Sequence, residues 1–255
     1  MASSALQTVE FFHLVFLRGL VAKGEDKSLV TLKGGCNLRF FFSSVRYSEG
    51  IDLDVRVMSK DTLKNKVDRL LKSPLIIAPL LARGVRVVEV SAPKQTDTTQ
   101  RWKIGLDVEG AAVPIRTKVE FSRRSDRASE EEAALEAVNP HVLAPYGLTP
   151  MLATHYRAAG AIVQKVNALA GRPEPQARDV FDLNLLLARV DAAKMTFPAK
   201  SKRDEAIENA MSISYDHYIA QVVAYLDPDH ASVYESKDAW GAMQDAVVAR
   251  LERGS

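Results

Sequence analysis

The stretch Ile51-Asp-Leu-Asp-Val-Arg-Val57 alternates apolar and polar residues, which predicts a strand that is buried on one face only. Residues i and i+2 of a strand point to the same face, so we expect Asp52 and Asp54 side by side, away from the apolar side chains. Paired carboxylates are costly unless a cation bridges them, and hard oxygen ligands of this kind suit Mg²⁺ together with substrate phosphates. The alternative interpretation is a strand whose acidic face is solvated.

A glycine pair lies upstream of this strand in Leu32-Lys-Gly-Gly-Cys-Asn-Leu38. We predict a strand over Ser28–Lys33, a turn at Gly34-Gly35 and helical turns over Asn37–Phe42. Backbone N–H groups at such a turn, next to a helix N-terminus, are suited to phosphate. A lone Gly-Gly is more often an ordinary turn, but a glycine turn, a short helix and an acidic strand in succession form a more specific pattern.

The rest of the first half predicts mixed secondary structure. Helices are expected at Ala5–Ala22 and from Asp61 to about Arg83, with a bend near Pro74 and Pro79. Three strands follow, at Val85–Ala92, Thr99–Val108 and Val113–Ser122, and their short connections suggest antiparallel neighbours. Glu120 on the last strand is a candidate third carboxylate, although taken alone it is more typical of a surface residue.

The second half of the chain predicts helices almost throughout. We expect them at about 150–170, 177–190, 202–226 and 237–252, with breaks at glycine and proline positions. The charged and then proline-rich segment 123–147 is the expected boundary. The fold class is therefore α+β, with a mixed-sheet lobe over residues 1–147 followed by an all-helical lobe over residues 148–255.

The helical half carries a second set of charged candidates. Asp179 and Asp182 are spaced i, i+3 and share a helix face. Lys165 and Arg172 could neutralise a triphosphate, and the guanidinium of arginine is suited to a two-pronged grip on phosphate. The alternative is ordinary helix salt bridging, with Arg178 and Asp182 as an i, i+4 pair.

Composition limits the class of protein. The 255 residues are 47% hydrophobic and 26% charged, which is usual for a soluble globular chain, and a net charge of +2 does not advertise nucleic-acid binding. The single cysteine, Cys36, rules out internal disulfides and fits a reducing cytoplasm. We expect no signal peptide and no membrane span. The histidines show no metal-ligand spacing, and a Cys36–His nucleophilic pair stays an open but minor alternative.

Five segments, in this order, resemble the motif series of the AbiEii/AbiGii-type nucleotidyltransferase toxins. They are Leu32-Lys-Gly-Gly-Cys-Asn-Leu-Arg39, Arg46-Tyr-Ser-Glu-Gly-Ile-Asp-Leu53, Lys118-Val-Glu-Phe121, Lys165-Val-Asn-Ala-Leu169 with Arg172, and Arg178-Asp-Val-Phe-Asp-Leu183. The resemblance implies a nucleotidyltransferase-fold lobe, a helical lobe, an NTP substrate and Mg²⁺. The family is known for toxins paired with antitoxins in phage defence, some of which modify tRNA ends.

This resemblance suggests a role for each candidate. Asp52 and Asp54 would hold Mg²⁺, and Glu120 would be a third ligand or the base. Phosphates would be held by Gly34, Gly35, Ser48, Lys165 and Arg172, and Asp179 would orient Lys165 or the acceptor. The expected reaction is in-line attack of a hydroxyl, on RNA such as tRNA or on a protein, at the α-phosphate of the NTP, releasing pyrophosphate.

The chain departs from the family pattern at one important position. Where the family has Ser-x-Asp-Ile-Asp-Leu, this chain has Ser48-Glu-Gly-Ile-Asp-Leu53, so Gly50 replaces the first expected aspartate. Either Asp54 supplies the missing carboxylate, or Glu49 reaches in, or activity is weakened or lost. Glu49 is the poorest candidate because adjacent strand residues face opposite ways. We therefore expect a slow or inactive transferase in which Gly50→Asp raises activity, and the rival interpretation is a non-catalytic nucleotide-binding module.

Overall fold

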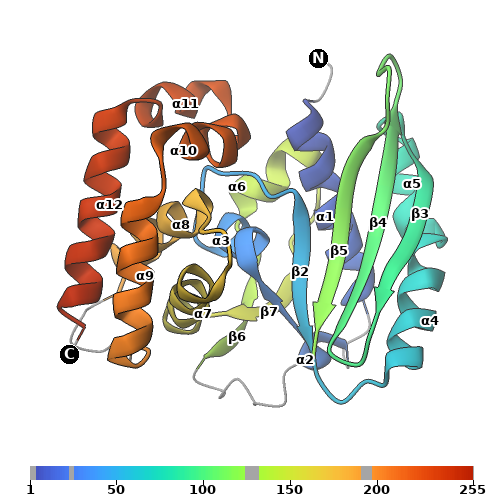
Figure 1. Cartoon of the computed structure of the whole chain (residues 1–255). Coiled ribbons are helices and arrows are strands. Elements are labelled where there is room, and N and C mark those ends of the chain that lie inside the picture. The colour runs from blue at the N-terminus through green and yellow to red at the C-terminus, as the bar shows by residue number, and fades with distance from the viewer. Residues whose placement is uncertain (1–3, 23–25, 124–131, 191–196, 255) are drawn as a thin grey trace. The chain divides into compact units, whose positions relative to one another are not determined.

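The computed structural model describes residues 4–22, 26–123, 132–190 and 197–254 (Figure 1). The chain divides into two compact units. The first comprises Met1–Ser43, Tyr47–Ser129 and Ala133–His155. The second comprises Ser44–Arg46, Glu130–Glu132 and Tyr156–Ser255. Each unit is described by itself below.

The first unit is built on a mixed sheet whose described strands follow the order β3-β4-β5-β2-β1-β7-β6. The strands are β1 (Val30–Lys33), β2 (Gly50–Val55), β3 (Val85–Gln95), β4 (Thr99–Val108), β5 (Ile115–Ser122), β6 (Ala133–Ala137) and β7 (Leu152–Tyr156). The pairs β3/β4, β4/β5 and β1/β2 are antiparallel, whereas β2/β5 and β1/β7 are parallel. The predicted mixed sheet and the antiparallel run β3-β4-β5 are confirmed.

Helices cover the apolar face of the central strands (Figure 1). Those of the first unit are α1 (Ala5–Leu20), α2 (Asp26–Leu29), α3 (Gly34–Phe41), α4 (Lys60–Leu71), α5 (Pro74–Leu81), α6 (Pro140–Leu143) and the 3₁₀ helix η1 (Ala144–Tyr146). α1 begins at a capping box in which Ser4 and Gln7 exchange side-chain hydrogen bonds, which satisfies two of the free N–H groups at its start. Its Phe12 and Phe16 are fully buried in one core with Trp102 and Phe121 of the sheet. This burial fixes which face of β4 and β5 is left polar.

The second unit is helical, as expected. Its helices are α7 (Ala158–Gly171), α8 (Ala177–Leu187), α9 (Lys200–Ser212), α10 (Tyr215–Gln221), the 3₁₀ helix η3 (Val223–Tyr225), α11 (Pro228–Tyr234) and α12 (Lys237–Glu252). α7 packs against α8 and α9, and α12 packs against α8 and α9. Ile162, Val166, Leu183, Leu186 and Val247 are fully buried there.

The sheet extends further along the chain than the sequence predicted. Leu152–Tyr156, expected to begin a helix over 150–170, instead forms β7 and pairs with β1 through Leu32 and His155. The two units accordingly separate after His155, later than the change expected after residue 147. Parallel pairing with a strand from the start of the chain leaves no local sequence signal, which explains why this strand was missed.

Smaller differences concern helix ends. The helix predicted from Asp61 to Arg83 is two helices, because α4 ends at Leu71 and α5 begins at Pro74, a position that proline favours. The N-cap of α4 is Ser59 and not Asp61. The helix predicted over 202–226 is interrupted after Ser212. In the described residues, no helix is both long and apolar enough to cross a membrane.

Candidate active site

Asp52 lies at the centre of the sheet, on the strand that the sequence predicted. β2 runs between β1 and β5, and Asp52 is in register with Lys33 on one side and with Glu120 on the other. The neighbours Ile51 and Leu53 are fully buried on the other face. Asp52 and Glu120 are thus adjacent carboxylates on one polar face, the arrangement that the sequence predicted for the third acid.

The glycine turn packs directly against Asp52. Gly34 has a φ of +68°, a conformation that residues with a side chain rarely adopt, and it opens α3. A Cβ placed on Gly34 would lie 3.0 Å from the Asp52 Oδ2 atom. Gly35 follows in the first turn of α3, and Ser48 lies half-buried just before β2. The predicted proximity of the Gly-Gly turn to Asp52 is therefore present, with the N-terminus of a helix beside the carboxylate.

The other two predicted metal ligands are engaged by cations. Asp54 is buried, and its Oδ1 atom lies 2.5 Å from the Lys33 Nζ atom. The Glu120 Oε2 atom lies 2.5 Å from the Arg101 Nε atom. In the part of the chain that the structure describes, no three His, Cys, Asp or Glu side chains converge as a ready-made metal site. Asp52 and Glu120 are neighbours in register, and Asp52 lies against the glycine turn.

Gly50 makes room for a lysine. It is buried at the start of β2 and is in register with Lys118 of β5. A Cβ on Gly50 would lie 2.4 Å from Lys118 Cγ, 2.8 Å from Lys118 Cε and 3.0 Å from the Lys118 backbone oxygen. The Lys118 stem therefore fills the space in which an aspartate at position 50 would begin. An aspartate there must displace Lys118, a constraint that the sequence did not reveal.

A buried histidine and the cysteine support the start of β2. The His13 Nε2 atom lies 2.8 Å from Thr117 Oγ1, which in turn donates to the backbone oxygen of Glu49 at 2.8 Å. Thr117 Oγ1 therefore accepts from Nε2–H, so Nδ1 of His13 is unprotonated and faces the Cys36 sulfur at 3.5 Å. Cys36 also lies 3.4 Å from the Gly50 backbone oxygen.

This pair is not a nucleophilic site. Burial lowers the pKa of His13 from 6.5 to about 3, so the ring stays neutral and does not accept the thiol proton near neutral pH. Cys36 is itself buried. The contact between Cys36 and His13 is therefore structural, and it helps to position the backbone of Gly50 at the start of the strand that carries Asp52.

In the second unit, the charged candidates form one buried network. Asp179 and Asp182 on α8 are fully buried, and Lys165 on α7 contacts both, with Nζ at 2.8 Å from Asp179 Oδ1 and 2.6 Å from Asp182 Oδ2. Arg172 Nε lies 3.2 Å from Asp179 Oδ2. Arg46 reaches Asp182 with its NH2 atom at 3.0 Å from Oδ2. The predicted meeting of Lys165 with Asp179 is therefore present.

The ion pairs set the charge states in this network. Burial alone would raise the pKa of Asp182, but Arg46 and Lys165 outweigh it and hold that pKa below its ordinary value. Burial would lower the pKa of Lys165, but Asp179 and Asp182 outweigh it and raise that pKa. Both groups are therefore charged at neutral pH. Arg46, which is distant in sequence, completes the network, and the sequence did not predict its pairing with Asp182.

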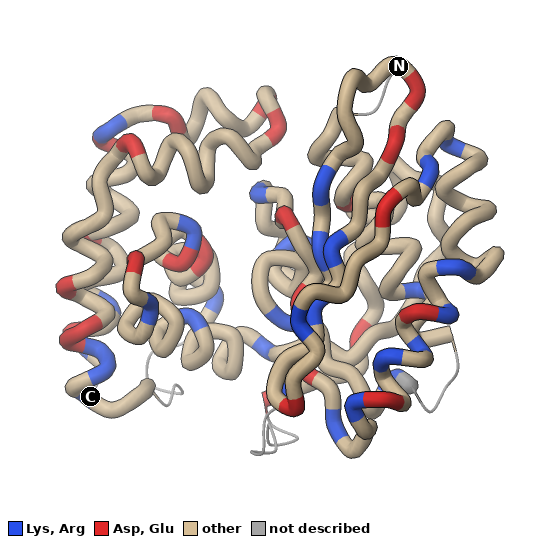
Figure 2. The backbone as a smooth tube through the Cα atoms, turned by 45° about the vertical axis from the view of Figure 1, so that its right-hand side comes forward, with Lys and Arg blue, Asp and Glu red and all other residues tan. Residues whose placement is uncertain are grey.

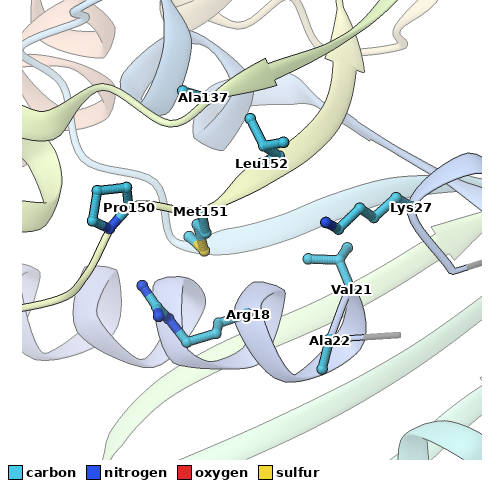
Figure 3. A pocket seen from close by; sticks show the side chains of 8 residues that line it. All are labelled: Arg18, Val21, Ala22, Lys27, Ala137, Pro150, Met151 and Leu152. Carbon is cyan, nitrogen blue, oxygen red and sulfur yellow. The ribbon is translucent and has the colours of Figure 1, made fainter. Parts of the chain in front are cut away.

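A separate hollow of about 350 Å³ lies elsewhere in the first unit (Figure 3). It is lined mainly by apolar side chains, with Arg18 and Lys27 as its two cations (Figure 3). Arg18 is engaged, because its NH1 atom donates to Thr149 Oγ1 at 2.7 Å. None of the predicted carboxylates lines this hollow, so it is not the candidate active site.

Comparison with known proteins shows the family of this chain. The model of the family described as "Nucleotidyl transferase AbiEii toxin, Type IV TA system" matches residues 15–250. The chain belongs to the AbiEii family of nucleotidyltransferase toxins. No curated protein sequence is similar enough to count as a relative.

Two solved structures share the fold of this AbiEii-family chain. JHP933 from Helicobacter pylori is 16% identical, with a TM-score of 0.58 over 99% of this chain and 96% of that one. MenT4, a nucleotidyltransferase toxin from Mycobacterium tuberculosis H37Rv, is 18% identical, with a TM-score of 0.58 over 97% of this chain and 83% of that one. At these identities the likeness establishes the nucleotidyltransferase-toxin fold alone.

The buried His13 of this AbiEii-family protein makes stability depend on pH. Its folded-state pKa of about 3 lies below the ordinary 6.5, so the unfolded chain binds the extra proton between these values and stability falls as the pH falls below 6.5. The loss is at most about 1.4 kcal/mol per pH unit. We predict that His13→Gln flattens the dependence of the free energy of unfolding on pH, measured by urea unfolding at a series of pH values. His141→Gln, at an exposed position, should leave this dependence unchanged. If the pH dependence is the same in His13→Gln as in wild type, the lowered pKa of His13 is not its cause.

Asp182 forms ion pairs with two buried cations, Arg46 and Lys165. Asp182→Asn is expected to lower the free energy of unfolding by about 3 kcal/mol at neutral pH, because Arg46 and Lys165 lose a buried counter-charge. Since the pKa of Asp182 is lowered, its contribution is present above 3.8 and is lost as the pH falls further, so wild type and variant should converge in strong acid. Thermal unfolding measures this, with exposed Asp245→Asn as the control, and a silent Asp182→Asn would refute it.

Proposed function

We propose that this toxin transfers the NMP group of a Mg²⁺-bound NTP to a hydroxyl of an RNA such as tRNA, or of a protein, and releases pyrophosphate. The observation that carries the proposal is the placement of Asp52, with Glu120 directly beside it on β5 and Gly34 packed on its carboxylate. Carboxylates and free backbone N–H groups meet at one point, as a phosphate and a metal ion require together.

The donor chemistry near Asp52 fits Mg²⁺. The carboxylates of Asp52 and Glu120 offer hard oxygens, and Mg²⁺ needs few protein ligands because it keeps waters and binds substrate phosphates. Bound there, the ion would neutralise charge on the phosphates and help to orient the α-phosphate. Asp54, predicted as a ligand, is held by Lys33 and is better suited to fixing β1 against β2. Glu120 is also paired with a cation, Arg101, but it is more exposed than Asp54 and lies directly beside Asp52 in the sheet, so we rank Asp52 and Glu120 above Asp54 as ligands.

The protein's own groups would divide the remaining work. The N–H groups of Gly34 and Gly35 would hold phosphate oxygens at the start of α3. Glu120 would accept the proton of the attacking hydroxyl or share the metal ion. Lys165 and Arg172 of the second unit stay proposed phosphate-binding residues, and Asp179 holds the Lys165 amine at 2.8 Å.

The biological setting is proposed from the family. A type IV toxin–antitoxin system implies a cognate antitoxin, and we propose that this chain acts in the cytoplasm as such a toxin, in defence against phage. A small regulator gene directly beside its own would support this assignment.

A second candidate function rests on Gly50. With the Lys118 stem in the place of the family's first carboxylate, the protein could bind Mg²⁺-NTP and transfer slowly or not at all. Calorimetric titration with Mg²⁺-NTPs, combined with label transfer from α-³²P NTP to RNA and protein, separates binding from transfer.

The first functional prediction concerns Asp52. Asp52→Asn keeps the size of the side chain but removes the charge that a metal ion needs, so label transfer should fall by at least about 100-fold, equivalent to about 2.7 kcal/mol. Asp61→Asn, at an exposed position on α4, is the matched control. Full transfer by Asp52→Asn would remove the proposed site.

The second functional prediction concerns Gly50 and Lys118 together. Because Lys118 lies over Gly50, we expect Gly50→Asp alone to gain little, since the new carboxylate meets the lysine. Gly50→Asp combined with Lys118→Ala should raise Mg²⁺-dependent transfer, measured at saturating acceptor, by about tenfold, the effect of about 1.4 kcal/mol.

Asp54→Ala completes this series of variants. If wild type already matches the double variant and Asp54→Ala abolishes transfer without unfolding the protein, then Asp52 and Asp54 form the true site. The prediction that the wild-type protein is a slow or inactive transferase would then be wrong.

A further inference from the structure

The polar face of the sheet carries charges in rows that cross the strands, and Figure 2 marks lysine and arginine along these strands in blue. One row contains Glu89 of β3 and Arg116 of β5, which form an ion pair across Gly105 of β4. A Cβ on Gly105 would lie 3.0 Å from Glu89 Cβ and 3.3 Å from an Arg116 nitrogen, so glycine leaves room for this pair. The cation of this row, Arg116, is therefore paired with an acid, Glu89.

The row that contains the candidate active site is balanced as well. Arg101 of β4, Glu120 of β5, Asp52 of β2 and Lys33 of β1 are in successive register. Arg101 pairs with Glu120, and Lys33 reaches Asp54 at the next position along β2 on the same face. This row therefore contains two bases and two acids, and each base forms an ion pair with an acid of the same face.

The row between these two is different. It consists of Ser91 of β3, Lys103 of β4, Lys118 of β5 and Gly50 of β2, in successive register. Two lysines stand directly opposite each other, and the row contains no acid. Like charges in this position destabilise a sheet. Within the described part of the chain, neither Lys103 nor Lys118 forms an ion pair, so the row would be stabilised by an anion from outside.

A hollow of about 870 Å³ opens over this row. Its lining includes four cations, Arg101, Lys103, Arg116 and Lys118, against the two acids Glu49 and Glu89. Glu89 is engaged by Arg116, as described above. The hollow therefore offers a net positive surface, a hydroxyl from Ser91 and no aromatic side chain among its lining residues. These are groups that bind phosphate oxyanions and not the faces of bases.

We propose that this hollow, centred on Lys103 and Lys118, binds the phosphate backbone of a single-stranded RNA acceptor. The inference rests on the proposed function and adds to it the position and class of the acceptor. Lys118 is two residues from Glu120 along β5, a separation of about 7 Å at the usual strand rise. A phosphate on Lys118 thus places the next sugar hydroxyl of the strand close to Asp52 and Glu120.

The position also suits the geometry of the reaction. The glycine turn lies on the β1 side of Asp52 and is assigned to the NTP, whereas the Lys103–Lys118 row lies on the β5 side. Attacking and leaving oxygens must be roughly in line, on opposite sides of the α-phosphate. An acceptor on the β5 side and pyrophosphate on the glycine side satisfy this requirement with Asp52 between them.

The test is the salt dependence of RNA binding, measured by fluorescence anisotropy with a labelled short oligouridylate in EDTA, so that no transfer occurs. Each phosphate contact to single-stranded RNA contributes about 0.7 to the slope of log K against log salt. We expect Lys103→Ala and Lys118→Ala each to reduce the slope by about 0.7, and Lys118→Arg to retain it. Lys72→Ala, an exposed lysine at the end of α4, should leave it unchanged. Equal slopes in all variants would overturn the proposal.

A second titration distinguishes between RNA and NTP as the ligand whose phosphate binds to the two lysines. Titration of NTP in EDTA into the same variants should show no loss for Lys103→Ala and Lys118→Ala. If these variants instead lose NTP affinity while RNA binding is unchanged, the row belongs to the nucleotide, and the RNA assignment is wrong.

Label transfer with Mg²⁺ separates this inference from the proposed function. A wild type that binds RNA through the two lysines but transfers no label would refute the transferase proposal and leave the RNA site. Transfer with lysine-independent RNA binding would refute the RNA site alone.

Discussion

The alternation of β2 is the constraint on which the rest of the first unit depends. Ile51 and Leu53 are fully buried beneath the sheet, so a slip of one residue would put Asp52 and Asp54 into the core and the apolar side chains onto the polar face. The cost of such a slip fixes the register with β1 and β5 at once. That register is what brings Glu120 beside Asp52 and sets the glycine turn against its carboxylate. The candidate site is thus a consequence of core packing on the reverse side of the same strand.

Ion pairs stabilise both units, but among the described residues only the helical unit holds carboxylates that are fully buried in a network of ion pairs. In the helical unit, Arg46, Lys165 and Arg172 surround the buried Asp179 and Asp182, and none of these carboxylates is left without a cation. A buried network of this kind is costly to desolvate and is stabilising only when complete. If Lys165 is to meet a phosphate, the phosphate must compete with two carboxylates. The network therefore holds the charged Lys165 amine in a defined position, while the two carboxylates offset the positive charge that a phosphate would meet.

The features predicted from sequence were those with a local signature. The period of β2, the strand–glycine–helix succession at Gly34 and the helical spacing of Asp179 each lie within one short segment, and the structure contains all of them. The features that were missed depend on pairing between distant segments. β7 forms a strand because it pairs with β1. Asp54 forms an ion pair with Lys33 because Lys33 is its diagonal neighbour on β1. Asp182 pairs with Arg46, which comes from the other half of the sequence. No periodicity within one segment contains such information, because register across a sheet is set by the whole core.

Gly50 and Lys118 are best understood as one feature and not as a lost residue beside an unrelated lysine. A side chain at position 50 would meet both the stem and the backbone oxygen of Lys118, so the glycine is what allows the lysine to lie flat across the start of β2. The exchange replaces a negative charge by a positive one in the same space. A metal ion would be held less firmly there, whereas an anionic substrate would be attracted more strongly. Under the proposed function, the fixed ammonium group of Lys118 would attract the phosphate backbone of the acceptor at the position where the family pattern has a carboxylate.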